Sequence, residues 1–255
     1  MIKNKSKIIA FACGMVLCLV SVVMIKTDFS PASDKVIVIQ NTNSAFVVQT
    51  KQNQNILVLP KSSSAYDSKN ISNTLSNNKI YSLDEIFLPN YTPSQNQTVL
   101  SLAEIYNLSK IVLPIEEQEN SVMLYSSLKR NGIICYEDFS IYQISNTLTL
   151  KSVFDSKNLK AICIEYQNGI VSKNFVQIVE NLTESQANKI IPNLPNNVDY
   201  LCLETYTAGA QKLLESEISF SRVLTKDNLY LSASEKALLS FQTNGGLVVS
   251  KKFVF

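Results

Sequence analysis

The order of apolar and polar positions predicts a series of short strands interrupted by a few helices. After residue 34, the apolar runs KVIVIQ, SAFVVQT and NILVLP are separated by Asn-rich turns, which is typical of an antiparallel meander. A polar stretch follows, in which Ile71 and Leu75 stand four residues apart. That spacing places both side chains on one helical face, so a short helix is expected there.

A strand, loop, helix, strand unit comes next. The apolar runs Glu85–Leu88 and Ile111–Leu113 each stop at a proline, and between them Val99–Leu108 has the spacing of an amphipathic helix. The polar loop Pro89–Gln97 lies just past the carboxyl end of a buried strand. Because α/β proteins usually place their active sites at such ends, this loop is the first candidate for a functional site.

The second half repeats the plan. Ser121–Arg130 predicts a helix in which Val122, Tyr125 and Leu128 stand three residues apart on an apolar face, with Leu124 beside them. The strands expected after it are GIICYE, FSIYQI, LTLKSVF, KAICIEY, GIVS, FVQIVE, VDYLCLE, SRVLT, GGLVVS and KFVF. The further helices expected are Thr183–Ile191, Gly209–Ser216 and Ser232–Phe241. Two β-rich halves with helices after their strands predict a four-layer αββα sandwich.

The amino-terminal run Ile8–Ile25 is uncharged and 18 residues long, and three lysines precede it. A helix of that length can cross a bilayer, and the lysines favour a cytoplasmic amino terminus with the body on the far side. The expected organisation is a stub and transmembrane anchor (1–27), a linker (28–34) and one domain (35–255). The alternative is a signal peptide cleaved near Ser30–Ala32, which would release a secreted protein.

Composition narrows the chemistry. The 255 residues are 45% hydrophobic and 17% charged, which suits a globular body, and the formal net charge of +2 predicts no general attraction for nucleic acid. Because the chain has no histidine, Ser-His-Asp and Cys-His catalysis and His-ligated zinc are excluded. Cys135, Cys163 and Cys202 lie in apolar runs and are expected as buried free thiols.

The segment order resembles the metallo-β-lactamase fold, and more narrowly the hydrolase-like domain of the ComEC family of bacterial DNA-uptake competence proteins. The stretches VIVIQNTNSAFVVQTKQNQNILVLP and IYSLDEIFLPNYTPSQNQTVLSLAEIYNLSKIVLP follow the family's opening pattern, including Asp84 and Pro114. The resemblance covers about Lys35 to Phe255. It implies a two-metal hydrolase site at the strand ends.

Carried over position by position, the implied ligands are all replaced in this chain. The family's metal loop T-H-x-x-x-D-H falls on residues 89–95, and its glycine-aspartate matches Glu180 and Asn181. The degenerate metal-site positions are Asn90, Thr92, Ser94, Gln95, Asn181, Thr205 and Ser232. A candidate ligand surface remains at Asn90, Glu180, Glu204, Asn228 and Tyr230. Amides and hydroxyls bind transition metals poorly, so neither a metal nor another cofactor is expected.

The leading hypothesis is therefore a single-pass membrane protein whose domain is a catalytically inactive relative of these hydrolases. The resemblance implies a link to DNA uptake, with DNA or a competence channel protein as partner. One alternative is an envelope protein-interaction scaffold. Another is a hydrolase with a different nucleophile, for which Ser126 and Lys129 have an S-x-x-K spacing.

Overall fold

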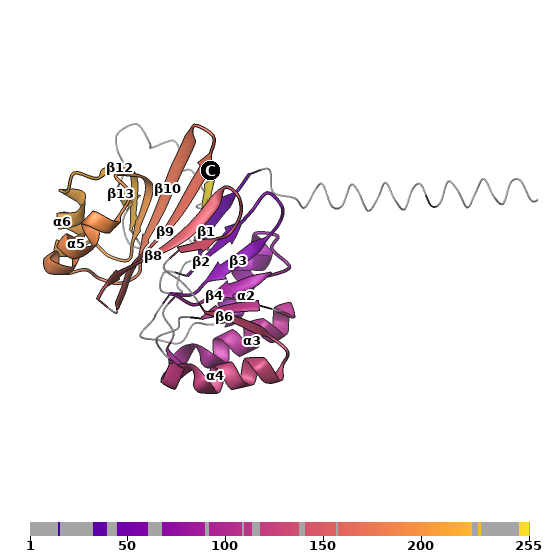
Figure 1. Ribbon diagram of the computed structural model, residues 1–255. Coiled ribbons are helices and arrows are strands. Elements are labelled where there is room, and N and C mark those ends of the chain that lie inside the picture. Colours follow the sequence, from indigo (N-terminus) through magenta and orange to yellow (C-terminus); the bar gives the residue numbers. More distant parts are fainter. Residues whose placement is uncertain are drawn as a thin grey trace, which may run out of the picture.

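Two β-sheets face each other in the computed structural model (Figure 1). The structure describes residues 15, 33–39, 45–60, 68–89, 92–108, 110–113, 118–137, 141–156, 158–225, 229–230 and 250–254. Apart from residue 15, the expected transmembrane run lies outside this set. Within the set, no helix combines the length and apolar character that a membrane crossing needs.

The first sheet has the order β14-β1-β2-β3-β4-β5-β6. Its strands are β1 (Lys35–Ile39), β2 (Phe46–Gln49), β3 (Asn55–Val58), β4 (Glu85–Phe87), β5 (Lys110–Leu113), β6 (Ile134–Glu137) and β14 (Ser250–Val254). β1, β2 and β3 form the predicted antiparallel meander, and β3 to β6 run parallel. The final strand pairs with β1, so the two ends of the body meet in this sheet.

The second sheet has the order β13-β12-β11-β10-β9-β8-β7. Its strands are β7 (Ile141–Gln143), β8 (Leu148–Asp155), β9 (Asn158–Asn168), β10 (Val171–Ile178), β11 (Asn197–Leu203), β12 (Ser219–Thr225) and β13 (Leu229–Tyr230). β7 to β10 are antiparallel neighbours, whereas β10, β11 and β12 are parallel.

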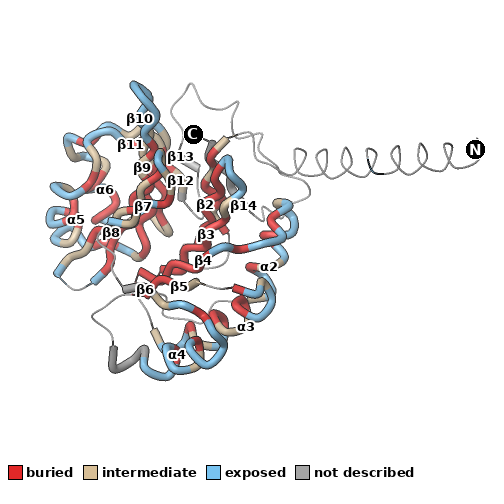
Figure 2. The backbone as a smooth tube through the Cα atoms, turned by 45° about the vertical axis from the view of Figure 1, so that its right-hand side comes forward, coloured by how far each residue is buried: buried red, intermediate tan, exposed pale blue. Residues whose placement is uncertain are grey.

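Helices cover the outer face of each sheet (Figures 1 and 2). The first sheet carries α2 (Ser68–Asn77), α3 (Asn96–Tyr106, after the 3₁₀ turn η1, Pro93–Gln95) and α4 (Gln118–Arg130). The second carries α5 (Glu184–Ile190, followed by η3, Ile191–Asn193) and α6 (Ala208–Leu214).

Three separate apolar cores confirm the four-layer αββα order. One lies between the first sheet and its helices and includes Ile71, Leu75, Leu102 and Leu128. The middle core joins the two sheets and includes Phe46, Phe87, Ile164 and Phe175. The third lies under α5 and α6 and includes Cys163, Ala187, Leu201 and Leu213. Each sheet therefore buries both faces, which explains its continuous apolar runs.

Some local expectations were wrong. The inner face of α4 carries Leu124 and Leu128, while Val122 is 55% and Tyr125 37% exposed. The stretches GIVS and FVQIVE are not two strands, because β10 runs through both as one. Cys163 and Cys202 are buried thiols as expected, but Cys135 is only partly buried, because it lies on the edge strand β6. The expected helix Ser232–Phe241 and strand GGLVVS fall outside the described residues, except for Ser250.

The strands of both sheets begin and end at two opposite edges of the sandwich, and these two edges carry different residues. At one edge the Thr147 hydroxyl of the second sheet donates to the Asp34 carboxylate, just before β1, at 3.4 Å. Asp34 also accepts from Lys51 N at 2.7 Å. The carboxyl ends of the parallel strands β3–β6 and β10–β12 lie at the other edge, which is where the candidate site residues follow their strands.

Candidate functional site

The loop after β4 is organised around the side chain of Gln95, which is fully buried. Its Nε2 donates to the carbonyl oxygens of Leu59 (3.3 Å) and Pro60 (3.1 Å), at the end of β3. Its Oε1 accepts from the backbone N–H (2.8 Å) and hydroxyl (3.2 Å) of Thr92. Both polar ends of the amide are thus used to fasten this loop to the neighbouring strand end.

Thr92 and Ser94 complete the first half of the site. Their hydroxyl oxygens lie 2.9 Å apart, and Ser94 is exposed. Thr92 precedes the turn η1, with Pro93 at its first position, where the missing N–H is not needed. Asn90, the remaining predicted residue of this loop, lies outside the described residues.

The ends of β10 and β11 supply the second half. Because these strands are parallel and adjacent, Glu180 and Asn181 lie beside Glu204 and Thr205. The Thr205 hydroxyl donates to Asn181 Oδ1. The ends of β10 and β11 therefore lie side by side. Asn228 and Ser232 lie outside the described residues, as does the side chain of Tyr230.

A buried lysine, which the sequence interpretation missed, neutralises Glu180. Lys160 is 3% exposed and its ammonium binds Glu180 Oε1, while the Glu180 side chain is 45% exposed. Lys160 lies at the β8–β9 irregularity, and its carbonyl accepts from Val179 N at 3.0 Å. Only one feature of the sequence indicated it, namely that Lys160 is the charged first residue of the apolar run KAICIEY.

Two further buried polar groups face the space between the sheets. Ser152 and Gln177 both pair with Ile162, from opposite sides, so they lie in one cross-strand row. Ser152 Oγ and Gln177 Oε1 have no hydrogen-bond partner among the residues that the structure describes, although Gln177 Nε2 donates to Ile178 O at 3.0 Å. Groups of this kind are commonly satisfied by buried water.

The residues present do not fit the metal pair that the resemblance implies. Gln95 and Asn181 use their oxygens in protein hydrogen bonds, and Glu180 is held by an ammonium. Glu204 remains as one carboxylate, too few for a hard divalent cation. Among the described residues, no three His, Cys, Asp or Glu side chains are grouped as metal ligands. We therefore derive no reaction step through a metal.

A second polar cluster joins the two sheets away from these strand ends. Glu85, at the start of β4, is 1% exposed and accepts from the Lys110 ammonium (2.9 Å) and the Tyr142 hydroxyl (2.6 Å). Burial, together with the hydrogen bond to Glu85, raises the pKa of Tyr142 to about 12. Burial opposes the charge of Lys110, but its hydrogen bonds to Tyr142 and Glu85 outweigh that effect and raise its pKa. Tyr142 and Lys110 therefore stay protonated at neutral pH, and their hydrogen bonds to Glu85 hold the two sheets together.

Alternative nucleophiles lack a suitable setting. Ser126 and Lys129 are both exposed to solvent on α4. Burial raises the pKa of the Cys163 thiol to about 12, which keeps it protonated and unreactive.

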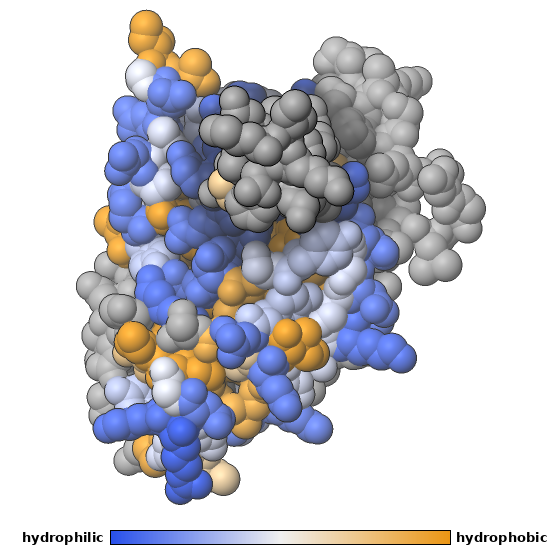
Figure 3. All heavy atoms as spheres, turned by 90° about the vertical axis from the view of Figure 1, so that its right-hand side faces the viewer, coloured by the Kyte–Doolittle hydropathy of each residue, from blue (hydrophilic) through white to orange (hydrophobic). Residues whose placement is uncertain are grey.

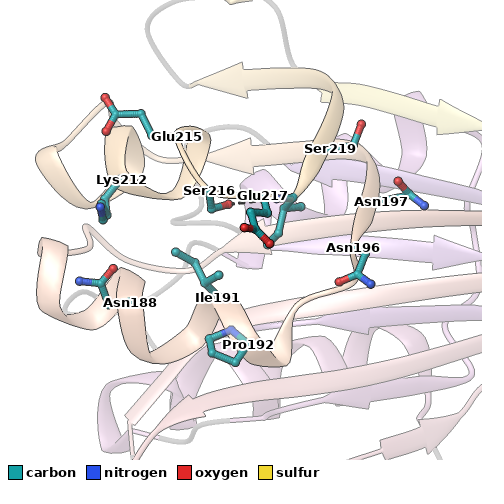
Figure 4. Close-up of a pocket in the computed structure, with 11 residues that line it drawn as sticks. Asn188, Ile191, Pro192, Asn196, Asn197, Lys212, Glu215, Ser216, Glu217 and Ser219 are labelled. Atoms are coloured by element: carbon teal, nitrogen blue, oxygen red, sulfur yellow. Dashed lines mark hydrogen bonds between the residues drawn. The ribbon is translucent and has the colours of Figure 1, made fainter.

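A polar groove of about 670 Å³ lies in the outer helical layer of the second sheet (Figure 4). It is lined by η3, the start of β11 and the segment between α6 and β12. Lys212, Glu215 and Glu217 supply its charges, and all three are exposed. The groove is at the amino ends of β11 and β12, so it is separate from the candidate site.

Comparisons with known proteins give a likeness in fold only. No protein-family model matches the chain, and no curated protein matches it in sequence. Among solved structures it is similar to the metallo-β-lactamase fold protein YhfI from Bacillus subtilis, at 10% identity and a TM-score of 0.49, over 75% of this chain and 85% of that chain. It is also similar to a diphosphatase from the PhnP family, at 8% identity and a TM-score of 0.47, over 86% of this chain and 97% of that one. At such values the diphosphatase activity of the second protein does not transfer to this chain.

Proposed function

We propose that this protein is a membrane-anchored, catalytically inactive relative of the metallo-β-lactamase-type hydrolases, and that it acts as a binding module accessory to DNA uptake. The observation that carries the loss of catalysis is the use of Gln95, Asn181 and Glu180 within the protein. A two-metal hydrolase needs free anionic or imidazole ligands at these positions.

The anchor and the DNA link come from the sequence. The uncharged run Ile8–Ile25 and the lysines before it support a single membrane crossing with the body outside the cytoplasm. The resemblance of residues 35–255 to the ComEC hydrolase-like domain supports the role in DNA uptake.

A protein-interaction scaffold in the envelope is the second candidate, favoured by exposed apolar side chains near one side of the sandwich. Met123 on α4 is 77% exposed, and Ile134 and Ile141 lie exposed on the edge strands β6 and β7. Unpaired sheet edges with apolar side chains are typical places for strand addition by a partner.

Metal analysis of the purified full chain tests the loss of catalysis. We expect no stoichiometric zinc or manganese after incubation with either ion, and no phosphodiesterase or β-lactamase turnover in their presence. Two bound equivalents of metal per chain, with turnover, would show that the protein is an enzyme.

Binding to single-stranded DNA separates the two candidate functions. A DNA-uptake role predicts binding that weakens steeply as salt rises, because phosphate contacts release counterions. If the full chain in detergent shows no salt-sensitive DNA binding at low ionic strength, the scaffold function replaces the DNA role.

A further inference from the structure

The hairpin of β9 and β10 ends in an apolar tip. Asn168 pairs with Val171, so Gly169 and Ile170 form a two-residue turn. Gly169 has φ +60°, and glycine at this first position is the pattern of a type II′ turn. Ile170 is 104% and Val171 53% exposed, and the tip stands out from the body as pale blue in Figure 2 and orange in Figure 3.

An isoleucine is an unexpected residue for such a turn. Hairpin turns favour Gly, Asn, Asp and Ser, which solvate well. Single exposed apolar residues are common on protein surfaces. Here, however, two β-branched side chains are adjacent at the outermost point of a hairpin, where nothing in the described structure covers them.

Hydrogen bonds connect the base of this hairpin to the point where the chain enters the body. Gln167 N donates to Thr147 O at 2.8 Å, and the Thr147 hydroxyl donates to Asp34 at 3.4 Å. Gln167 is three residues from Ile170, and Asp34 directly precedes β1. The apolar tip and the chain entry therefore lie at the same edge of the sandwich.

That edge has to stay near the bilayer if Ile8–Ile25 spans it. Eight residues separate Ile25 from Asp34, so the distance between these two is at most about 30 Å when the chain is fully extended. Lys51 lies beside Asp34, and Lys173 is two residues beyond Val171. Lysines in such positions favour contact with anionic lipid headgroups.

We propose that the hairpin tip, Gly169–Val171, inserts into the headgroup region of the membrane and forms a second membrane contact. This inference rests on the proposed amino-terminal anchor. Insertion is shallow, because the polar backbone of the turn must remain within reach of water. With this edge on the membrane, the opposite edge, which carries Gln95, Asn181 and Thr205, faces away from the lipid.

The absence of tryptophan from the chain makes the test direct. The full chain carrying Ile170→Trp is placed in vesicles of mixed anionic and zwitterionic lipids, brominated either near the headgroup or deep in the acyl chains. We expect blue-shifted emission, with most of it quenched by the shallow bromines and much less by the deep ones. Tyr206→Trp is the matched control, since Tyr206 is 55% exposed after β11 at the opposite edge, and its emission should not be quenched.

Vesicle flotation of the same samples separates the two proposals. If the protein floats with the vesicles but Ile170→Trp stays red-shifted and unquenched, the tip contact is wrong and the anchor stands. Equal quenching of both variants would contradict the proposed orientation, in which the hairpin tip touches the membrane and Tyr206 faces away from it. If the protein does not float, the anchor is wrong, and the tip contact is wrong with it.

Discussion

At the residue scale, Gln95 has a structural role in the loop after β4, at a position where the family resemblance implies a metal ligand. Its amide joins the loop after β4 to Leu59 and Pro60 at the end of β3, and no exposed part remains for a ligand. A buried amide with partners on both ends is costly to remove, because each partner is left without a hydrogen bond.

We expect Gln95→Ala to lower the free energy of unfolding by about 2–4 kcal/mol, since it leaves a cavity and unpairs the two carbonyls and Thr92 N. Urea denaturation followed by circular dichroism measures the change. Ser94→Ala, one residue away and exposed, is the control and should change stability by less than about 0.5 kcal/mol. If Gln95→Ala left the free energy of unfolding nearly unchanged, the structural role of Gln95 would be contradicted.

The ion pair of Lys160 and Glu180 predicts an asymmetry between its two partners. Lys160 is buried whereas Glu180 is half exposed. Removing the carboxylate therefore leaves a buried charge without its partner, whereas removing the lysine does not. We expect Glu180→Gln to cost about 3 kcal/mol. Lys160→Met, which keeps the apolar stem, should cost less than about 1 kcal/mol, because methionine replaces a buried charge with a side chain of similar volume.

Chemical denaturation of both variants measures this asymmetry, with Lys189→Met as the control. Lys189 pairs with Asp155 at 3.0 Å but is 57% exposed, so its loss should have an effect of at most about 1 kcal/mol. Equal costs for Glu180→Gln and Lys160→Met would mean that burial of the lysine does not decide the energetics.

At the element scale, the cluster of Glu85, Lys110 and Tyr142 ties the first sheet to β7, the edge strand of the second. The contact also brings the Tyr142 ring to 5.6 Å from Phe87, measured between ring centroids. A short edge strand has few backbone partners, so these side-chain contacts hold β7 in place.

Alkaline pH should weaken the stabilisation that the cluster of Glu85, Lys110 and Tyr142 provides. The pKa of Tyr142 is raised from 10.0 to about 12 and that of Lys110 is also raised, so the folded state favours both protonated forms. The stabilisation they provide is complete below about pH 10 and is lost as pH rises towards 12. We expect the free energy of unfolding to fall across that window, as measured by urea titration at fixed pH.

Tyr142→Phe should remove part of this alkaline loss and cost about 1–2 kcal/mol at pH 8, because Glu85 loses a hydrogen bond. Tyr206→Phe is the control, since Tyr206 is exposed and should leave the pH profile unchanged. An unaltered profile in Tyr142→Phe would show that other groups cause the alkaline loss.

At the scale of the whole molecule, the middle core makes the two halves one folding unit. Phe46 of the first sheet and Phe175 of the second are fully buried, and their rings meet edge to face with centroids 5.6 Å apart. Aromatic pairs of this geometry stabilise the folded state beyond what the burial of their apolar area contributes.

We expect Phe46→Ala and Phe175→Ala each to cost about 3–5 kcal/mol, and the double variant to cost less than their sum, because the two rings are partners. Hydrogen exchange should show lowered protection in both sheets for either variant. Loss of protection confined to the sheet that carries the substitution would mean that the halves unfold independently.

Local sequence patterns were sufficient for most of the elements. The four-layer order was predicted from the apolar runs of β1–β3, the spacing of Ile71 and Leu75 in α2, and the two β-rich halves. This was possible because a sheet that is buried on both faces has continuous apolar runs in its sequence. On α4 the pattern was right for Leu128 but wrong for Val122 and Tyr125, which are exposed, because only packing against the sheet decided which of the clustered apolar residues are buried.

The loop after β4 was singled out in the sequence because it follows a buried strand. Asn181 and Thr205 were singled out by the family resemblance alone. What these residues do there was decided only by the tertiary structure. Gln95 meets Leu59 and Pro60 from 35 or more positions away, and Lys160 of β9 meets Glu180 just past the end of the neighbouring strand β10. Sequence patterns report the face on which a side chain lies, but the partner of a polar group depends on distances that exist only once the sheets have packed.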